Sequence, residues 1–170
     1  MKKIIYDAVF LTLGMVLPFL TGQIKEIGDS LLPMHLAVMR CGRTLGSKHG
    51  LLVGAVLPIF RAICFAMPPL YPNAVWMSLE LATYGFAIGF VYSKMPKNKV
   101  YSVYASLILS MVCGRIVWGI AKAFLLGISG KAFTITMFVS GGIIDAIPGI
   151  ILQLILIPIV FKITTIVKSL

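Results

Sequence analysis

Apolar residues dominate the chain in six runs, and polar residues, glycines and prolines gather between the runs. An α-helix needs about 20 apolar residues to cross the hydrocarbon core of a bilayer. The pattern therefore predicts an all-α, polytopic membrane protein, a six-helix bundle in one transmembrane domain over residues 1–170. The predicted helices cover about residues 4–20, 32–45, 49–66, 74–92, 100–126 and 133–166.

Two of these predicted helices have unusual lengths. The second is short, which indicates a tilted or only partly spanning segment, and the sixth is longer than a bilayer needs. Pro148 and Pro158 are expected to kink the sixth helix or to let its end leave the membrane. The loop MPPLYPN (residues 67–73) holds three prolines and separates the third helix from the fourth.

Composition supports a bilayer environment. Hydrophobic residues make up 59% of the chain and charged residues 12%, and the mean hydropathy is +1.03. The net charge of +10 follows from basic residues between the apolar runs. The positive-inside rule explains them without nucleic-acid binding. In the six-helix topology, ten lysines and arginines lie on the side of the membrane that carries both termini, and only Lys25 and Lys131 lie on the other side. This excess predicts that both termini are cytoplasmic. The ten are Lys2, Lys3, Arg40, Arg43, Lys48, Lys94, Lys97, Lys99, Lys162 and Lys168.

Charged residues inside the predicted spans are functional candidates, because each costs about 2.5–3.5 kcal/mol in hydrocarbon. Counted at about 1.5 Å per residue from the outer helix ends, Arg40, Arg61 and Glu80 lie about 9–10 Å deep and form one predicted layer. His35 lies only about 3 Å deep. The same count places Arg115 and Asp145 together, roughly 16 Å deep. Both sets are read either as structural ion pairs or as parts of a ligand site.

Aromatic and amide side chains accompany these charges on the outer side, namely Tyr71, Asn73, Trp76, Tyr84 and Trp118. Trp and Tyr at helix ends are typical of an interfacial belt. The alternative is the wall of a site for a flat organic solute, because such sites are apolar with a few convergent polar groups.

Small residues recur at four-residue spacing and predict close helix packing. They lie at Gly42, Gly46, Gly50 and Gly54, and again at Gly85 and Gly89. Ala8 and Thr12 form a similar pair on the first helix, which packs either internally or against a partner membrane subunit. The cysteines (Cys41, Cys64 and Cys113) lack metal spacing and are expected to be reduced thiols.

Several catalytic motifs are missing from the sequence. The chain has no GxxxxGK[ST] nucleotide loop, no HExxH motif and no GxSxG motif. We therefore expect no enzyme activity, no cofactor and no bound metal.

The segments PMHLAVMRCG, LLVGAVLPIFRAICFAMPPLYPNA and ELATYGFAIGFVY resemble the substrate-binding (S) component of energy-coupling factor (ECF) vitamin transporters. This resemblance implies a six-helix protein of the bacterial plasma membrane that binds a micronutrient near its outer face, beneath the loops 21–32 and 67–73. It also implies a separate transmembrane coupling (T) component and two ATPase subunits as partners. The family's Ala-xxx-Ala docking motif on the first helix is reduced here to Ala8 and Thr12.

The leading hypothesis is a subunit that captures a vitamin-like solute for an ATP-driven importer. The candidate solute-binding residues are His35, Arg40, Arg61, Tyr71, Asn73, Glu80, Tyr84, Arg115 and Trp118. Their arginines would hold a polar or anionic group, and their aromatic rings would stack on a ring of the solute. A self-sufficient carrier or small channel, and a membrane assembly subunit without a ligand, are the alternatives.

Overall fold

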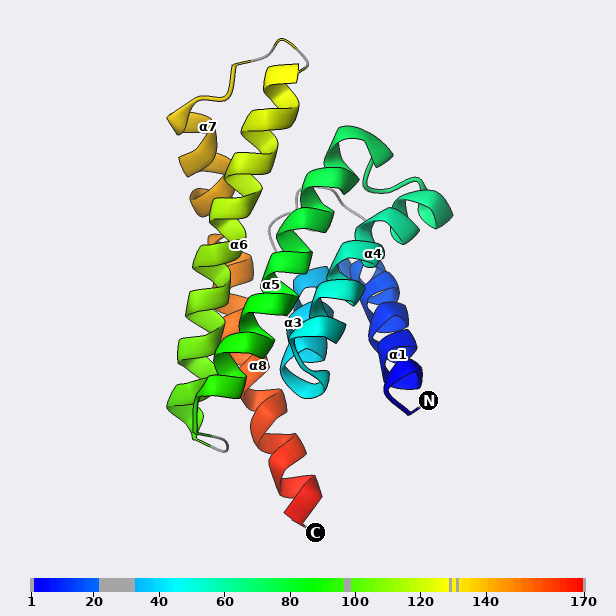
Figure 1. Ribbon diagram of the computed structural model, residues 1–170, viewed down its shortest axis with the longest axis vertical. Helices are drawn as coiled ribbons and strands as arrows, with labels where there is room; N and C mark the ends of the chain where they lie inside the picture. Colours follow the sequence, from blue (N-terminus) through cyan, green and yellow to red (C-terminus); the bar gives the residue numbers. More distant parts are fainter. Residues whose placement is uncertain (1, 22–32, 97–98, 129, 131, 170) are drawn as a thin grey trace.

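The chain folds into helices that pack side by side, as the computed structural model shows (Figure 1). The structure describes residues 2–21, 33–96, 99–128, 130 and 132–169, and these residues form no β-strand. In chain order the elements are α1 (Lys2–Val16), η1 (Leu17–Thr21), α3 (Pro33–Leu45), α4 (Ser47–Phe65), η2 (Leu70–Ala74), α5 (Val75–Lys94), α6 (Val100–Ile128), α7 (Ile135–Val139), η3 (Ser140–Ile144) and α8 (Ile147–Ser169).

Two ends of the molecule serve as reference points below. The upper end carries η2 and the C-terminal end of α6, and the lower end carries the start of α1 and the end of α8 (Figure 1). Helices α3, α5 and α8 run from the upper end toward the lower end, whereas α6 runs upward. Most of the predicted loop 21–32 lies outside the described residues.

Three helical segments are long and apolar enough to cross a membrane: Ser47–Phe65, Leu70–Lys94 and Val100–Ile128. A fourth is added if residues 135–142 and 147–159, which meet at a bend of 40°, form one span. These counts cover the described residues. The apolar helices thus agree with a polytopic membrane protein, while the predicted number of six spans stays a prediction.

The last apolar segment is divided rather than continuous from residue 133 to residue 166. Helix α7 ends at Val139, the π-helical turn η3 follows, and α8 begins at Ile147. The division therefore comes before Pro148, whereas Pro158 lies within α8. Gly141 and Gly142 lie in η3, and their backbone packs against the indole of Trp118. A Cβ atom at Gly142 would approach Trp118 Cζ3 to 3.0 Å, so the divided segment fits closely over that ring.

Helix α5 is the centre of the packing, with α4 and α3 on one side and α6 on the other. The predicted glycines make this possible. A Cβ atom at Gly85 would overlap the backbone of Gly50, and a Cβ atom at Gly42 or Gly50 would overlap the carbonyl of Gly85. Gly46 joins α3 to α4 with φ of 105°. Residues that have a Cβ atom rarely adopt this backbone conformation, whereas glycine adopts it readily. The helices consequently approach to backbone contact.

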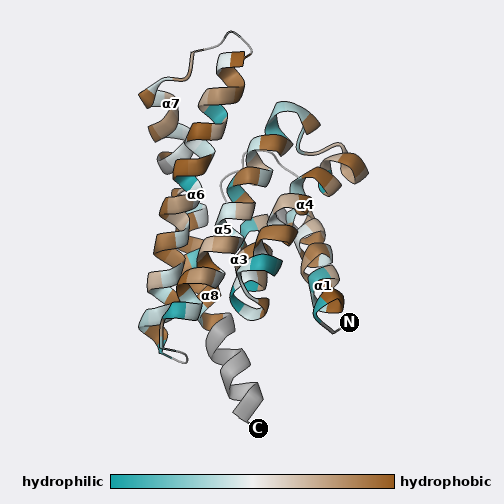
Figure 2. Cartoon of the chain, in the orientation of Figure 1, coloured by the Kyte–Doolittle hydropathy of each residue, from teal (hydrophilic) through white to brown (hydrophobic). Residues whose placement is uncertain are grey.

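Hydrophobic residues occur along all of the main helices (Figure 2), and many of the large ones are exposed. Ile63 on α4 and Ile120 and Phe124 on α6 are 65–69% exposed. So much exposed apolar surface is unusual for a protein surrounded by water and is typical of one surrounded by lipid.

The buried apolar residues form two cores on opposite sides of α3. One core joins α3, α5, α6 and α8 through Met39, Tyr84, Met111 and Ile157, among others. The second core joins α3, α4 and α5 and packs against α1. It consists of Met34, Val38, Cys41, Val53, Leu57 and Leu81. Each core carries its own group of buried polar side chains.

Candidate functional site

A layer of polar side chains covers the upper end of the first core. Met39, Tyr84 and Ile157 belong to that core on three helices that run downward, and Met111 belongs to it on α6, which runs upward. On each of these helices a polar side chain lies four residues, about one helical turn, from the core residue and on the same face of the helix. In every case this polar side chain is the one nearer the upper end. These four side chains are His35 on α3, Glu80 on α5, Arg115 on α6 and Gln153 on α8. We call them the polar layer.

Glu80 is the anionic member of the polar layer and faces two nitrogen-bearing side chains. Its Oε1 lies 3.1 Å from Arg115 Nη1 and 3.5 Å from His35 Nε2. The His35 ring also packs edge-on against Tyr84, with 5.0 Å between the ring centroids. Gly114 leaves room for the Tyr84 ring, because a Cβ atom there would overlap it. Three helices thus meet around one carboxylate.

The polar layer is deeply buried and has unused hydrogen-bonding atoms. His35 and Gln153 are each 1% exposed, and Glu80 is 3% exposed. Within the described part of the chain, no hydrogen-bond partner is present for His35 Nδ1 and Nε2, Glu80 Oε1, Arg115 Nε and Nη2, or Gln153 Nε2. An unsatisfied buried polar group costs about 1–3 kcal/mol, so native proteins rarely retain several together without a reason. The polar layer can therefore form further hydrogen bonds with a polar group of a ligand.

Trp118 lies one turn above Arg115 on α6 and begins an aromatic and cationic region next to the polar layer. The Arg115 guanidinium carbon lies 5.9 Å from the indole centroid, and Lys122 Nζ lies 4.5 Å from it. Lys122 Nζ is also 5.5 Å from the ring of Trp76 on α5. Phe133 and Phe138 pack against Trp118 with centroid distances of 6.3 and 6.0 Å. Two positive charges therefore lie beside apolar rings above Glu80.

The predicted layer of Arg40, Arg61 and Glu80 is wrong in its two arginines. Arg61 lies on the side of α4 that faces α1, where Nη1 donates a hydrogen bond to the Met15 carbonyl. Its guanidinium lies over Phe19 at 5.2 Å and over Phe65 at 5.5 Å. Arg61 thus ties the end of α1 to α4 and forms no ion pair with Glu80 in the described structure.

Arg40 lies at a different level and on a different face of α3 from His35. Five residues separate them, which corresponds to about 7.5 Å along the axis and about 140° around it. Within the described residues, no ion pair joins Arg40 to Glu80. The depth of Arg40 was predicted from one end of its helix, and depth alone does not fix the direction of a side chain.

The predicted pairing of Arg115 with Asp145 is also wrong. Arg115 pairs with Glu80, and Asp145 is exposed next to η3. Asp145 contributes its backbone nitrogen, which donates to the Ser140 carbonyl at 2.9 Å. The division of the last segment turns Asp145 away from the polar layer.

Among the predicted aromatic and amide residues, Tyr84 and Trp118 lie at or beside the polar layer. Tyr71 is 56% exposed and Asn73 is half-buried, both in η2 above α5. No hydrogen bond in the described structure joins either residue to the polar layer. Their role in solute binding stays a prediction.

Ala8 and Thr12 are exposed on α1, and the Thr12 hydroxyl donates to the Ala8 carbonyl at 2.9 Å. The same helix exposes Ile5, Val9 and Val16. This part of α1 is therefore not covered by the other described helices.

Sequence reasoning missed Gln153 and Lys122. Gln153 is an isolated amide inside the apolar run IILQLILIP, and Lys122 is a cation inside α6. Polar residues within apolar segments are functional candidates for the same reason as Glu80. The signal was present for both residues.

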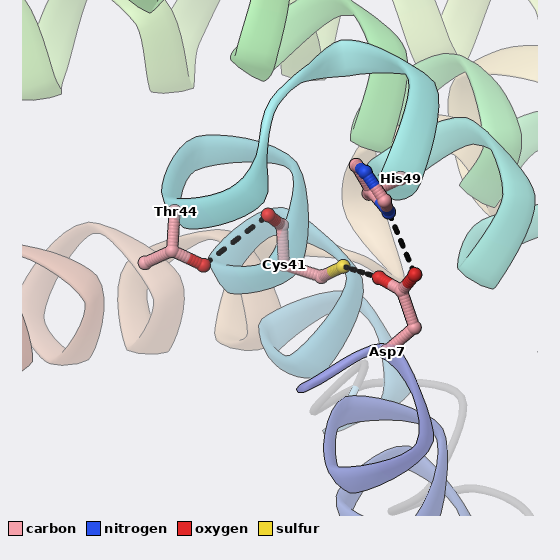
Figure 3. A network of polar contacts seen from close by, with 4 residues as sticks. All are labelled: Asp7, Cys41, Thr44 and His49. Carbon is pink, nitrogen blue, oxygen red and sulfur yellow. Dashed lines mark hydrogen bonds and ion pairs between the residues drawn. The ribbon is translucent and has the colours of Figure 1, made fainter. Parts of the chain in front are cut away.

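A second polar group, also missed, joins α1, α3 and α4 at the lower side of the second core (Figure 3). We call Asp7, Cys41 and His49 the lower cluster. His49 Nδ1 lies 2.6 Å from Asp7 Oδ2, and the Cys41 thiol donates to Asp7 Oδ1 at 3.7 Å. Thr44 on the same turn of α3 donates to the Cys41 carbonyl at 3.3 Å. Within the described residues, no three His, Cys, Asp or Glu side chains are arranged to hold a metal ion.

Comparison with known proteins identifies the family of the chain. Residues 2–161 match the family described as "ECF transporter, substrate-specific component". Neither the curated proteins nor the solved structures gave a match. The family match extends from the start of α1 into α8 and includes every member of the polar layer. The chain belongs to the family of substrate-specific components of ECF transporters.

Proposed function

We propose that this chain captures a vitamin-like solute from outside a bacterial cell and that the solute binds at the polar layer. Members of its family are transport subunits that handle a small-molecule substrate and work with a T component and ATPases. The observation that carries the site is the set of buried polar atoms without a hydrogen-bond partner, in His35 and Arg115 beside Glu80 and in Gln153 on α8. Tyr84 and Trp118 would contact the apolar part of the solute.

The orientation we propose places the upper end outside and both termini in the cytoplasm. The basic residues concentrated near the termini and the lower loops support this orientation. The solute then enters beneath η2. Six spans across one domain, with α7 and α8 sharing the last, complete the proposed topology.

We further propose that the T component docks on α1. The exposed strip of α1 carries the small residues Ala8 and Thr12 beside the apolar Ile5 and Val9. Small residues allow close approach of a helix from another subunit in the membrane. ATP hydrolysis by two separate ATPase subunits would then drive inward delivery of the solute.

The proposal is tested by native mass spectrometry and by transport. The purified chain is expected to retain a small molecule, and uptake of that molecule is expected only when the T component and both ATPases are present. ATPases with an inactivated nucleotide site provide the control. Net uptake by the chain alone would instead favour a self-sufficient carrier. Failure to detect any bound molecule or uptake would favour an assembly subunit.

A further inference from the structure

Arg115 uses one nitrogen for Glu80 and leaves one edge of its guanidinium unused. Nη1 lies 3.1 Å from Glu80 Oε1, and within the described structure Nε and Nη2 are buried without a hydrogen-bond partner. Nε–H and Nη2–H lie on the same edge of the planar group. Two parallel N–H donors of this kind match the two oxygens of a carboxylate. This edge of Arg115 is therefore suited to binding a carboxylate.

Among the other buried atoms without a hydrogen-bond partner, Gln153 Nε2 is a donor and Glu80 Oε1 is an acceptor. Gln153 lies one turn from Ile157 on α8, and Ile157 shares the first core with Met111, which lies one turn from Arg115 on α6. Glu80 Oε1, the acceptor of the polar layer, already faces Arg115 and His35. A ligand group rich in acceptors would satisfy donors that the protein leaves unsatisfied.

The charges of the site favour a single negative charge on the solute. Arg115 and Lys122 carry two positive charges around Trp118, and Glu80 carries one negative charge. A carboxylate places one negative charge near Glu80, whereas a phosphate ester, with a charge of about −1.5 to −2, would be repelled more strongly by that carboxylate.

We propose, given that the polar layer is the solute site, that the solute is a monocarboxylate and that the Nε–Nη2 edge of Arg115 binds its carboxylate side-on. Gln153 donates to the same group, and Lys122 adds positive potential from above. The apolar remainder of the solute lies against Trp118 and the rings that surround it. Glu80 holds the guanidinium in place through Nη1 and so acts as a positioning residue.

The experiment compares carboxylic acids with their uncharged counterparts on the full chain in lipid nanodiscs. The probes are nicotinate and nicotinamide, biotin and biotin amide, lipoate and lipoamide, and pantothenate and pantothenol. Thermal shift identifies the pairs that bind, and titration calorimetry measures both members. We expect at least one acid to bind, and to bind about tenfold or more tightly than its uncharged counterpart, because a charged hydrogen bond is lost in the latter.

Variants test the geometry of the Arg115 edge. Arg115→Lys keeps the charge but loses the planar edge, so it is expected to weaken acid binding about tenfold or more and to reduce the preference for the acid. Arg43→Lys, at the lower end of α3, is the matched control and is expected to keep both. Lys122→Gln is expected to weaken the acid more than the uncharged counterpart, and Lys94→Gln controls for loss of a charge.

The inference is overturned if an uncharged member binds as tightly as its acid, or if no acid of the panel binds. It is also overturned if Arg115→Lys keeps the full preference for the acid. Native mass spectrometry on the same nanodiscs separates these results from failure of the proposed function. A bound neutral or cationic molecule would retain the solute-binding role and exclude only the monocarboxylate.

Discussion

The polar layer and the lower cluster are built from similar residues and differ in what they leave unused. Each contains a histidine and a carboxylate from different helices, Glu80 with His35 and Asp7 with His49. In the lower cluster His49 and Cys41 occupy both oxygens of Asp7, and the His49 contact is short, at 2.6 Å. In the polar layer the His35 contact is 3.5 Å, and donors around Glu80 have no partner in the described structure.

This difference separates a group that connects helices from a group that also accepts a ligand. In the described structure no buried atom of the lower cluster lacks a hydrogen-bond partner, and two of its side chains are partly exposed, 15% for Asp7 and 27% for His49. In the polar layer, Arg115 is 13% exposed, but His35, Glu80 and Gln153 lie almost wholly out of solvent, and several donors are unsatisfied. Burying a charge is costly unless ion pairs and hydrogen bonds offset the loss of its hydration. We therefore expect substitutions in the two groups to affect stability and solute affinity differently.

The largest effect is expected from Glu80→Ala, which leaves the Arg115 guanidinium buried without its carboxylate. Removing one partner of a buried ion pair costs about 3–5 kcal/mol. The double variant Glu80→Leu with Arg115→Met is expected to regain most of this free energy of unfolding, because neither charge is then buried alone. It is not expected to regain solute affinity. Unfolding in detergent and solute-induced thermal shift measure the two quantities.

A double variant that keeps solute affinity would contradict the assignment of the polar layer as the binding site. A double variant as unstable as Glu80→Ala would show that the loss comes from packing and not from an unpaired charge. Ile88→Val, in the same core below the polar layer, is the control for a small packing change, expected to cost about 0.5–1.5 kcal/mol.

The positions of the helices could be predicted from the sequence to a large extent. Apolar periodicity and the breakers around Gly46 and Pro68 delimit α3, α4 and α5 to within a few residues. The close contact of Gly50 with Gly85 also follows from small-residue spacing. The division between α7 and α8 did not follow, because it depends on tertiary packing of η3 against Trp118.

The members of the site could be predicted only in part. Charge in an apolar segment marks Glu80, His35 and Arg115, but depth counted along a helix does not give the direction of a side chain. Arg61 faces α1 instead of Glu80. Arg115 was placed too deep because α6 reaches higher than the start of α5 (Figure 1), so the outer ends of these helices are not level.

An intermediate effect is expected from Asp7→Ala in the lower cluster. The substitution removes the acceptor for both His49 and Cys41 and is expected to cost about 1–3 kcal/mol. Solute affinity should stay within about twofold of the wild type, a difference of about 0.4 kcal/mol, because the cluster belongs to the other core. Titration calorimetry and unfolding of the same preparation provide the check. A loss of affinity as large as that of Glu80→Ala would show that the two groups are not independent.

The smallest effect, and one of opposite sign, is expected from Gln153→Leu. The leucine removes a buried amide whose Nε2 has no partner in the described structure and keeps a side chain of similar length. The solute-free protein is therefore expected to gain about 1 kcal/mol of stability, because the cost of an unsatisfied donor disappears. Solute affinity is expected to fall about tenfold, because the donor is absent when the solute binds.

Opposite signs for stability and affinity are what distinguish a binding residue from a structural one at this position. A structural amide would lose stability on replacement and leave affinity unchanged. Ile157→Val, one turn below Gln153 on α8, should cost about 0.5–1.5 kcal/mol without altering affinity. Unfolding of the solute-free protein and calorimetric titration of both variants decide between these readings. If Gln153→Leu is destabilising and binds solute normally, Gln153 belongs to the core of the bundle and not to the solute site.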